Sequence, residues 1–241
     1  MEETVQETGH RSDEMDPYIF GAFALAYLGL LVWVLKKQRF WTLMSVLAAV
    51  ALALVYDNGI LAIGSLIGEG TLLEGLSLAR FWLHALVTPT LILFSLGAMR
   101  QAGIGWAQKG WAALLFWAAT IAAVVVEYAT VLSDLKLEKS ESYGVLSYSS
   151  AEEASGPPAM ILIVLAALLI AGIFLAWKAG SWWMLAGTIA MTIGSMFNPD
   201  IPSEAATNLF ELILIGSLAV TKVKLEERPA GGTDSGVTVL E

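Results

Sequence analysis

Long apolar runs recur along the whole chain, and they constrain its fold more than any other feature. Seven runs, separated by polar connections, cover residues 17–35, 40–67, 72–99, 111–133, 159–177, 181–197 and 205–221. A run of about 20 apolar residues spans a bilayer as a helix. Inside hydrocarbon, a helix satisfies every backbone polar group within its own segment. The sequence therefore predicts an all-α, polytopic integral membrane protein with seven transmembrane helices.

The composition fits this fold and excludes several classes of function. Hydrophobic residues make up 57% of the 241 residues and charged residues 15%, against about 45–50% and 25% in soluble domains. The net charge of −9 opposes binding to phosphate backbones, so no nucleic-acid partner is expected. Without cysteine, and with two histidines, neither a metal site nor a cofactor is predicted. Membrane lipids are the expected partners, and the oligomeric state is left open.

The basic residues predict the orientation, because they gather on the cytoplasmic side of membrane proteins. Most of them fall on one side of a seven-helix plan, next to helix ends: Lys36, Lys37, Arg39, Arg100, Lys109, Lys178, Lys222, Lys224 and Arg228. The other side receives Arg11, Arg80, Lys136 and Lys139. We therefore expect a multi-pass protein of the plasma (inner) membrane, with the amino terminus outside and the carboxyl terminus in the cytoplasm.

The remaining organisation is simple. Residues 1–15 are expected to form a mobile acidic tail, residues 16–224 the transmembrane domain, and residues 225–241 a mobile cytoplasmic tail. The connection over residues 134–158 is either a lid over an outer cavity or a solvated loop. The segments GLLVWVLKKQRFW from Gly29 and GIFLAWKAGSWW from Gly172 are compatible with a parallel repeat of three, one and three helices. The alternative is that apolar helices with terminal tryptophans simply look alike.

The second and third apolar runs give the firmest three-dimensional prediction. Asp57 lies about twelve residues before the glycine-containing turn at residues 68–71, and Arg80 and His84 lie about ten and fourteen residues after it. At about 1.5 Å per residue, all three are about 16–21 Å from the turn. An antiparallel hairpin therefore brings Asp57 level with Arg80 and His84. In the alternative, the second helix ends at Asp57 and residues 59–79 lie at the membrane interface.

Ionisable and polar side chains inside the other runs are expected to meet Asp57 and Arg80 in the outer half of the bundle. Such groups are costly inside a membrane and therefore mark candidate sites. The first and fifth runs carry almost no polar residues, so we expect them to face lipid. The candidate catalytic residues are Asp57, His84, Glu127 and Glu211. The candidate substrate-binding residues are Asn58, Arg80, Thr88, Tyr128, Ser195, Asn198 and Asn208.

Two classes of function suit such a pocket. Three carboxyl groups with one arginine cannot all stay ionised in a dry site, so at least one is expected to hold a proton and to serve as a donor. With aromatic walls, this favours a small membrane-embedded enzyme that uses acid–base chemistry on a lipid or isoprenoid. The alternative is a small-solute or proton- or cation-coupled transporter or binding protein. For single residues, a structural role is the third interpretation: an Asp57–Arg80 ion pair that only fixes helix register.

Both classes have a known family with a similar layout. In size, helix number and acidic residues on the second and seventh helices, the chain resembles the small integral-membrane terpene cyclases, in layout only and without a shared motif. The plan of three, one and three helices with the amino terminus outside is similar to that of the sugar-transporting SWEET family. The chain has none of the Pro-Gln pairs typical of the wider PQ-loop group.

Overall fold

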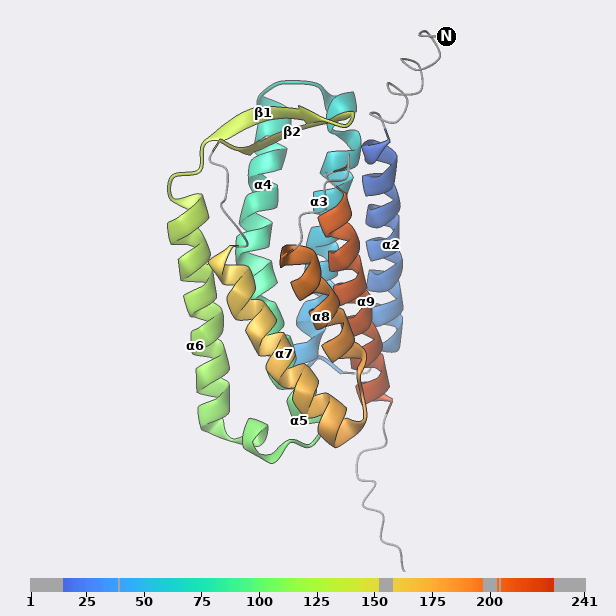
Figure 1. Ribbon diagram of the computed structural model, residues 1–241, viewed down its shortest axis with the longest axis vertical. Coiled ribbons are helices and arrows are strands. Elements are labelled where there is room, and N and C mark those ends of the chain that lie inside the picture. Colours follow the sequence, from blue (N-terminus) through green and yellow to red (C-terminus); the bar gives the residue numbers. More distant parts are fainter. Residues whose placement is uncertain (1–14, 39, 152–157, 197–202, 204, 228–241) are drawn as a thin grey trace, which may run out of the picture.

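The chain folds into a bundle of helices along one long axis, with a small β-hairpin across one end (Figure 1). The computed structural model describes residues 15–38, 40–151, 158–196, 203 and 205–227. Its helices are α2 (Asp16–Lys37), α3 (Val46–Ile67), α4 (Thr71–Val87), α5 (Leu91–Gln101), α6 (Gly110–Glu127), α7 (Ala159–Ala179), α8 (Trp183–Met196) and α9 (Ala206–Glu226). The 3-10 turns are η1 (Leu43–Ser45), η2 (Thr88–Thr90) and η3 (Gly105–Gln108), and η4 (Tyr128–Leu132) is a π-helical turn. The strands are β1 (Leu137–Ser142) and β2 (Val145–Ser150).

Six helical spans are long and apolar enough to cross a membrane, where the sequence predicts seven. They are Asp16–Lys37, Leu43–Ile67, Thr71–Gln101, Gly110–Leu132, Ala159–Ala179 and Ala206–Glu226. The seventh apolar segment forms α8, which has 14 described residues. Such a helix is about 21 Å long, shorter than the hydrocarbon core of about 30 Å. The structure thus supports a mostly helical membrane protein, while the seven-span plan, the orientation and the repeat stay predictions.

The long hairpin of the second and third runs is confirmed. Helix α3 continues past Asp57 to Ile67, and α4 begins four residues later at Thr71. Gly68 and Gly70, with φ of 80° and 150°, make the turn in backbone conformations that side chains with a Cβ rarely adopt. The alternative helix end at Asp57 is therefore wrong.

The connection after η4 is more ordered than a solvated loop. Strands β1 and β2 pair antiparallel, and β2 packs on α3 and α4. The Ser65 hydroxyl donates to the Gly144 carbonyl at 2.7 Å and accepts from the Leu146 amide at 3.1 Å. A Cβ on Gly64 would lie 1.9 Å from the Leu146 carbonyl oxygen, so glycine is what lets the hairpin approach α3. The hairpin adds two short strands to a mostly helical chain, and the choice between a lid and a solvated loop stays a prediction.

The expectation that the first and fifth runs face lipid is only half right. Helix α2 packs against α3 and α9, and its Phe20 and Tyr27 are fully buried. Helix α7 crosses the bundle diagonally and packs on α5, α6 and α8 (Figure 1). Its Met160, Leu168 and Leu175 lie in the main hydrophobic core. Each helix therefore has one face in the core and one exposed apolar face.

Candidate functional site

An ion pair between α3 and α4 is the centre of the site. The Arg80 Nε donates to Asp57 Oδ1 at 2.8 Å, and the two side chains keep 16% and 27% of their surface exposed. The neighbouring Tyr56 hydroxyl donates to the Leu76 carbonyl at 3.0 Å, which ties the same two helices together. The predicted pairing of Asp57 with Arg80 is thus confirmed as a contact, and it places a partly accessible charge pair inside the helical hairpin.

A second polar group joins α3 to α9 beside this pair. The Asn58 side chain is fully buried, and its Nδ2 donates to the Leu54 carbonyl at 3.0 Å. Its Oδ1 accepts from Asn208 Nδ2, also at 3.0 Å. The Tyr27 hydroxyl of α2 lies 3.5 Å from both the Asn208 carbonyl and Glu211 Oε2. Three helices therefore contribute to one buried hydrogen-bonded group with a carboxyl at its edge.

His84 and Thr88 continue the polar stripe of α4 toward the kink at Pro89. The Thr88 Oγ1 and His84 Nδ1 are 3.4 Å apart. Arg80, His84 and Thr88 thus follow one another at intervals of four residues, on the face whose Arg80 meets Asp57 of α3.

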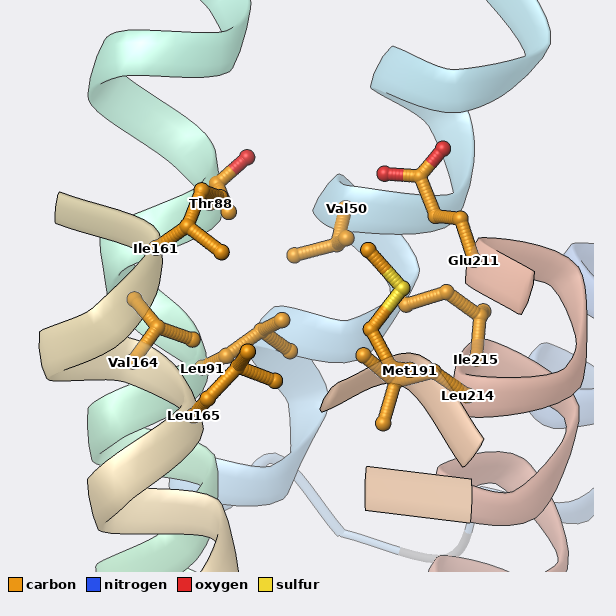
Figure 2. A pocket seen from close by; sticks show the side chains of 10 residues that line it. All are labelled: Val50, Thr88, Leu91, Ile161, Val164, Leu165, Met191, Glu211, Leu214 and Ile215. Atoms are coloured by element: carbon orange, nitrogen blue, oxygen red, sulfur yellow. The ribbon is translucent and has the colours of Figure 1, made fainter. Parts of the chain in front are cut away.

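A small cavity lies between α3, α5, α7, α8 and α9, and Glu211 is the ionisable residue in its wall. The cavity volume is about 30 Å³, and its lining residues are Val50, Thr88, Leu91, Ile161, Val164, Leu165, Met191, Glu211, Leu214 and Ile215. Figure 2 shows the Glu211 carboxyl and the Thr88 hydroxyl at one end of this space, with aliphatic side chains around the rest. A space of this size holds about one or two water molecules. It does not hold a lipid.

Glu211 has no cationic partner in the described part of the chain. The neighbouring arginine, Arg80, is already paired with Asp57, and the described contact of the Glu211 carboxyl is the long one with Tyr27. A carboxyl group at membrane depth without a counter-charge is costly as an anion. The arrangement therefore suits a group that holds a proton or a small cation.

Glu127 does not join this group. It is 4% exposed at the end of α6, and its Oε2 has no hydrogen-bond partner. None of its described contacts reaches Asp57, His84 or Glu211, and it does not line the cavity. The sequence predicts Glu127 at the same membrane depth as the other candidate residues. In the structure it lies at the end of α6, away from the cavity that Glu211 lines.

The other predicted binding residues are spread out. The Tyr128 ring is exposed and lies 6.3 Å from the Trp82 ring, centroid to centroid. The Ser195 hydroxyl donates to the Met191 carbonyl within its own helix at 2.9 Å. Asn198 lies outside the described residues. The predicted site therefore reduces to the part built by α3, α4 and α9, together with a tyrosine of α2.

The sequence prediction omits two residues: Tyr27, which joins the site, and Lys222, which forms a buried ion pair near the other end of α9. Tyr27 sits in a run with few polar residues, and only its position on the face toward α9 could have marked it. Lys222 was placed at a helix end, but its side chain is fully buried and pairs with Glu226 one turn further along α9. Among the buried atoms of the described chain, Glu226 Oε2 and Gln38 Oε1 at the same end lack partners.

These features define a polytopic helical membrane protein with a half-buried carboxyl beside a water-sized cavity. Comparison with protein families, with characterised proteins and with solved structures finds no match for the chain. Its function therefore has to be argued from its own residues.

Proposed function

We propose that the protein is a membrane transporter of protons, in which Glu211 takes up and releases the transported proton. The observation that carries this proposal is the Glu211 carboxyl in the wall of a cavity of about 30 Å³, with no cationic partner in the described residues. The space suits a proton carried by water and is too small for a lipid or isoprenoid. This favours the second of the two classes expected from the sequence.

The surrounding residues support the same role. The Asp57–Arg80 pair, partly exposed at 27% and 16%, is a polar entrance from which water can approach the buried group. The Tyr27 hydroxyl lies 3.5 Å from the Glu211 carboxyl, beside the hydrogen bond between Asn208 and Asn58. Chains of carboxyl and histidine side chains are the usual proton relays of membrane transporters. His84 and Thr88 supply such a relay between the ion pair and the cavity.

Toward its other end, α9 carries a buried lysine, Lys222. Glu211 and Lys222 are eleven residues apart, about 16 Å along the helix, and Ile215 and Leu218 lie between them on the same face. Lys222 pairs with Glu226. An apolar barrier with ionisable groups at both ends is the arrangement that a transporter needs in a closed state.

Infrared spectroscopy and proton flux together test the proposal. In pH-difference infrared spectra of the purified protein, Glu211→Gln should remove the carbonyl band of a titrating carboxyl. In liposomes with an internal pH-sensitive dye, a negative internal potential should drive proton uptake by the wild type but not by Glu211→Gln. Glu127→Gln is the matched control, because it removes a second buried carboxyl that does not line the cavity. Equal spectra and equal flux for Glu211→Gln and wild type would contradict the proposal.

An enzyme that uses acid–base chemistry on a lipid or isoprenoid is the second candidate. The observation that favours it is the partial exposure of Asp57, Arg80 and His84, which leaves them open to a substrate that arrives from the bilayer. Native mass spectrometry of the gently purified protein separates the two classes. A co-purified isoprenoid that changes mass on incubation would support the enzyme, and proton flux without any lipid product supports the transporter.

We also propose that the protein resides in the plasma (inner) membrane with its amino terminus outside. The support is the distribution of lysine and arginine next to helix ends. Reporter fusions after Lys109 and after Lys139 test it, because the two sites are expected on opposite sides. Equal labelling of both from one side would overturn the orientation.

A further inference from the structure

A groove on the lipid-facing side of the bundle is distinct from the carboxyl site. It lies between α5, α6 and α7, with a volume of about 390 Å³. Its lining residues are Ile92, Trp106, Trp111, Leu115, Phe116, Ala119, Ile163, Ala167 and Ile170. All of them are apolar or aromatic, and none belongs to the proposed proton site. The volume is within the usual range for small-molecule pockets, about 300–1,000 Å³.

Aromatic rings form the floor of one end of the groove. Trp106 stacks on Trp111, with centroids 5.9 Å apart and an angle of 16° between the rings. The Trp106 ring is tilted against the Phe116 ring, with centroids 6.3 Å apart, and meets the Phe174 ring edge-on, with centroids 5.5 Å apart. The Trp106 side chain thus closes the space where α6 and α7 diverge. From Trp111 to Ala119 the groove follows α6 for about 12 Å, which gives it an elongated shape.

Two basic residues flank the aromatic end. Lys109 is exposed and immediately precedes α6, two residues before Trp111. Arg100 is half-buried at the end of α5, and its Nε donates to the Ala107 carbonyl at 2.8 Å. This contact holds the guanidinium group beside the η3 turn that carries Trp106. The positive end of the α6 dipole lies at the same point. An elongated apolar groove therefore ends in a concentrated positive charge.

We propose that this groove binds one acyl chain of an anionic phospholipid, with the headgroup held by Lys109 and Arg100. The groove is apolar along its whole length, as a hydrocarbon chain requires. The positive charges at one end suit a phosphate-bearing headgroup. Both basic residues are on the side predicted to be cytoplasmic, where anionic lipids attract basic residues beside a membrane helix. A second copy related by a two-fold axis through the groove would bring the same basic residues to it and so lacks this complementarity.

Tryptophan quenching measures the proposed contact directly. The purified protein is titrated with phosphatidylglycerol or phosphatidylcholine that carries brominated acyl chains, and the loss of tryptophan fluorescence is recorded. The same titrations of Trp106→Phe and Trp111→Phe show how much of that loss comes from the two tryptophans of the groove. Phosphatidylglycerol should quench at lower concentration than phosphatidylcholine. Each basic residue near a membrane is worth about five-fold in partitioning. Lys109→Gln with Arg100→Gln should therefore reduce the preference for phosphatidylglycerol by about 25-fold.

A steric variant separates the groove from general lipid contact. Ala119→Leu places a larger side chain inside the groove and should reduce quenching by both lipids. Ala118→Leu, one residue earlier and exposed away from the groove, should leave quenching unchanged. Equal quenching by the two lipids, unaffected by the basic substitutions, would overturn the proposal. So would native mass spectra of a lipid-free dimer in which Ala119→Leu restores the monomer. Proton flux through Glu211 is independent of either outcome.

Discussion

The Asp57–Arg80 pair gives the most direct quantitative test of the site. Asp57→Asn or Arg80→Gln leaves the remaining charge without its partner at 2.8 Å, inside a helical hairpin. Breaking a fully buried pair costs about 3–5 kcal/mol. Because these side chains keep 27% and 16% of their exposure, we expect about 2–3 kcal/mol of lost unfolding free energy for each single variant.

The double variant distinguishes an ion pair from two independent contributions. With both charges removed, the loss should be close to that of one single variant, which corresponds to a coupling of about 2–3 kcal/mol. The measurement is reversible unfolding in mixed micelles at increasing SDS fraction, followed by circular dichroism. The exposed Lys139–Glu69 pair has a similar length, 3.0 Å, and serves as a control. Its coupling should be much smaller than that of Asp57–Arg80, because solvent and salt screen exposed charges.

Strictly additive losses for Asp57 and Arg80 would refute the reasoning. A stabilised double variant would not, because replacing a buried pair by neutral groups is often neutral or favourable. Repeating the cycle at high salt sharpens the result. A partly buried pair should keep most of its coupling, whereas a surface pair should not.

Three further predictions follow from single contacts. Gly64→Ala should cost about 1–3 kcal/mol by pushing the hairpin off α3 and should speed tryptic cleavage at Lys139. Gly59→Ala on the same helix meets no atom within 4 Å and should be neutral or stabilising by up to about 1 kcal/mol; equal effects would contradict this packing. Glu127→Met removes a buried unpartnered oxygen and should raise the unfolding free energy by about 1–3 kcal/mol. A lower unfolding free energy in SDS titration would contradict this, because it would mean that the Glu127 carboxyl has a hydrogen-bond partner. The hydrogen bond to Glu69 raises the pKa of Lys139 above 10.5, so this contact should stabilise the fold at neutral pH and lose its effect as pH rises through the raised value. Thermal unfolding of wild type and Lys139→Gln should therefore differ at pH 7 and converge at high pH.

The sequence predicts the membrane class and the α3–α4 hairpin because both depend on regular spacing. Apolar run length decides whether a helix can span hydrocarbon, and the rise per residue fixes which side chains are level across a turn. That arithmetic is sufficient to place Asp57 beside Arg80. It needs no knowledge of how the remaining helices pack.

The rest of the site depends on helix rotation and lateral order, which spacing does not encode. Glu127 has a suitable depth but lies on a different side of the bundle, and Tyr27 enters the site from a helix that appears featureless in sequence. The β-hairpin was unpredictable for a related reason. Its short strands are polar and resemble a solvated connection, and they are ordered by contacts with Ser65 and Gly64 that are 79 to 82 residues away along the chain.

The proton site and the apolar barrier beneath it impose a condition on any transport cycle. Helix α9 carries Glu211 at the cavity and Lys222 near its end, and Leu218 between them is fully buried. A proton at Glu211 has no polar route along this face in the state described, because Leu214, Ile215 and Leu218 pack into the main core. Transfer therefore requires α9 to move relative to its neighbours. Helix α8 packs against it so closely that a Cβ on Gly187 would lie 1.9 Å from the Ser217 hydroxyl oxygen. The Ser217 side chain occupies the space that a side chain at Gly187 would fill, and the Phe210 ring does the same at Gly194. Helix α9 therefore has to carry α8 with it or withdraw both side chains before it can slide past, so the motion that the proposed function demands involves the two helices together.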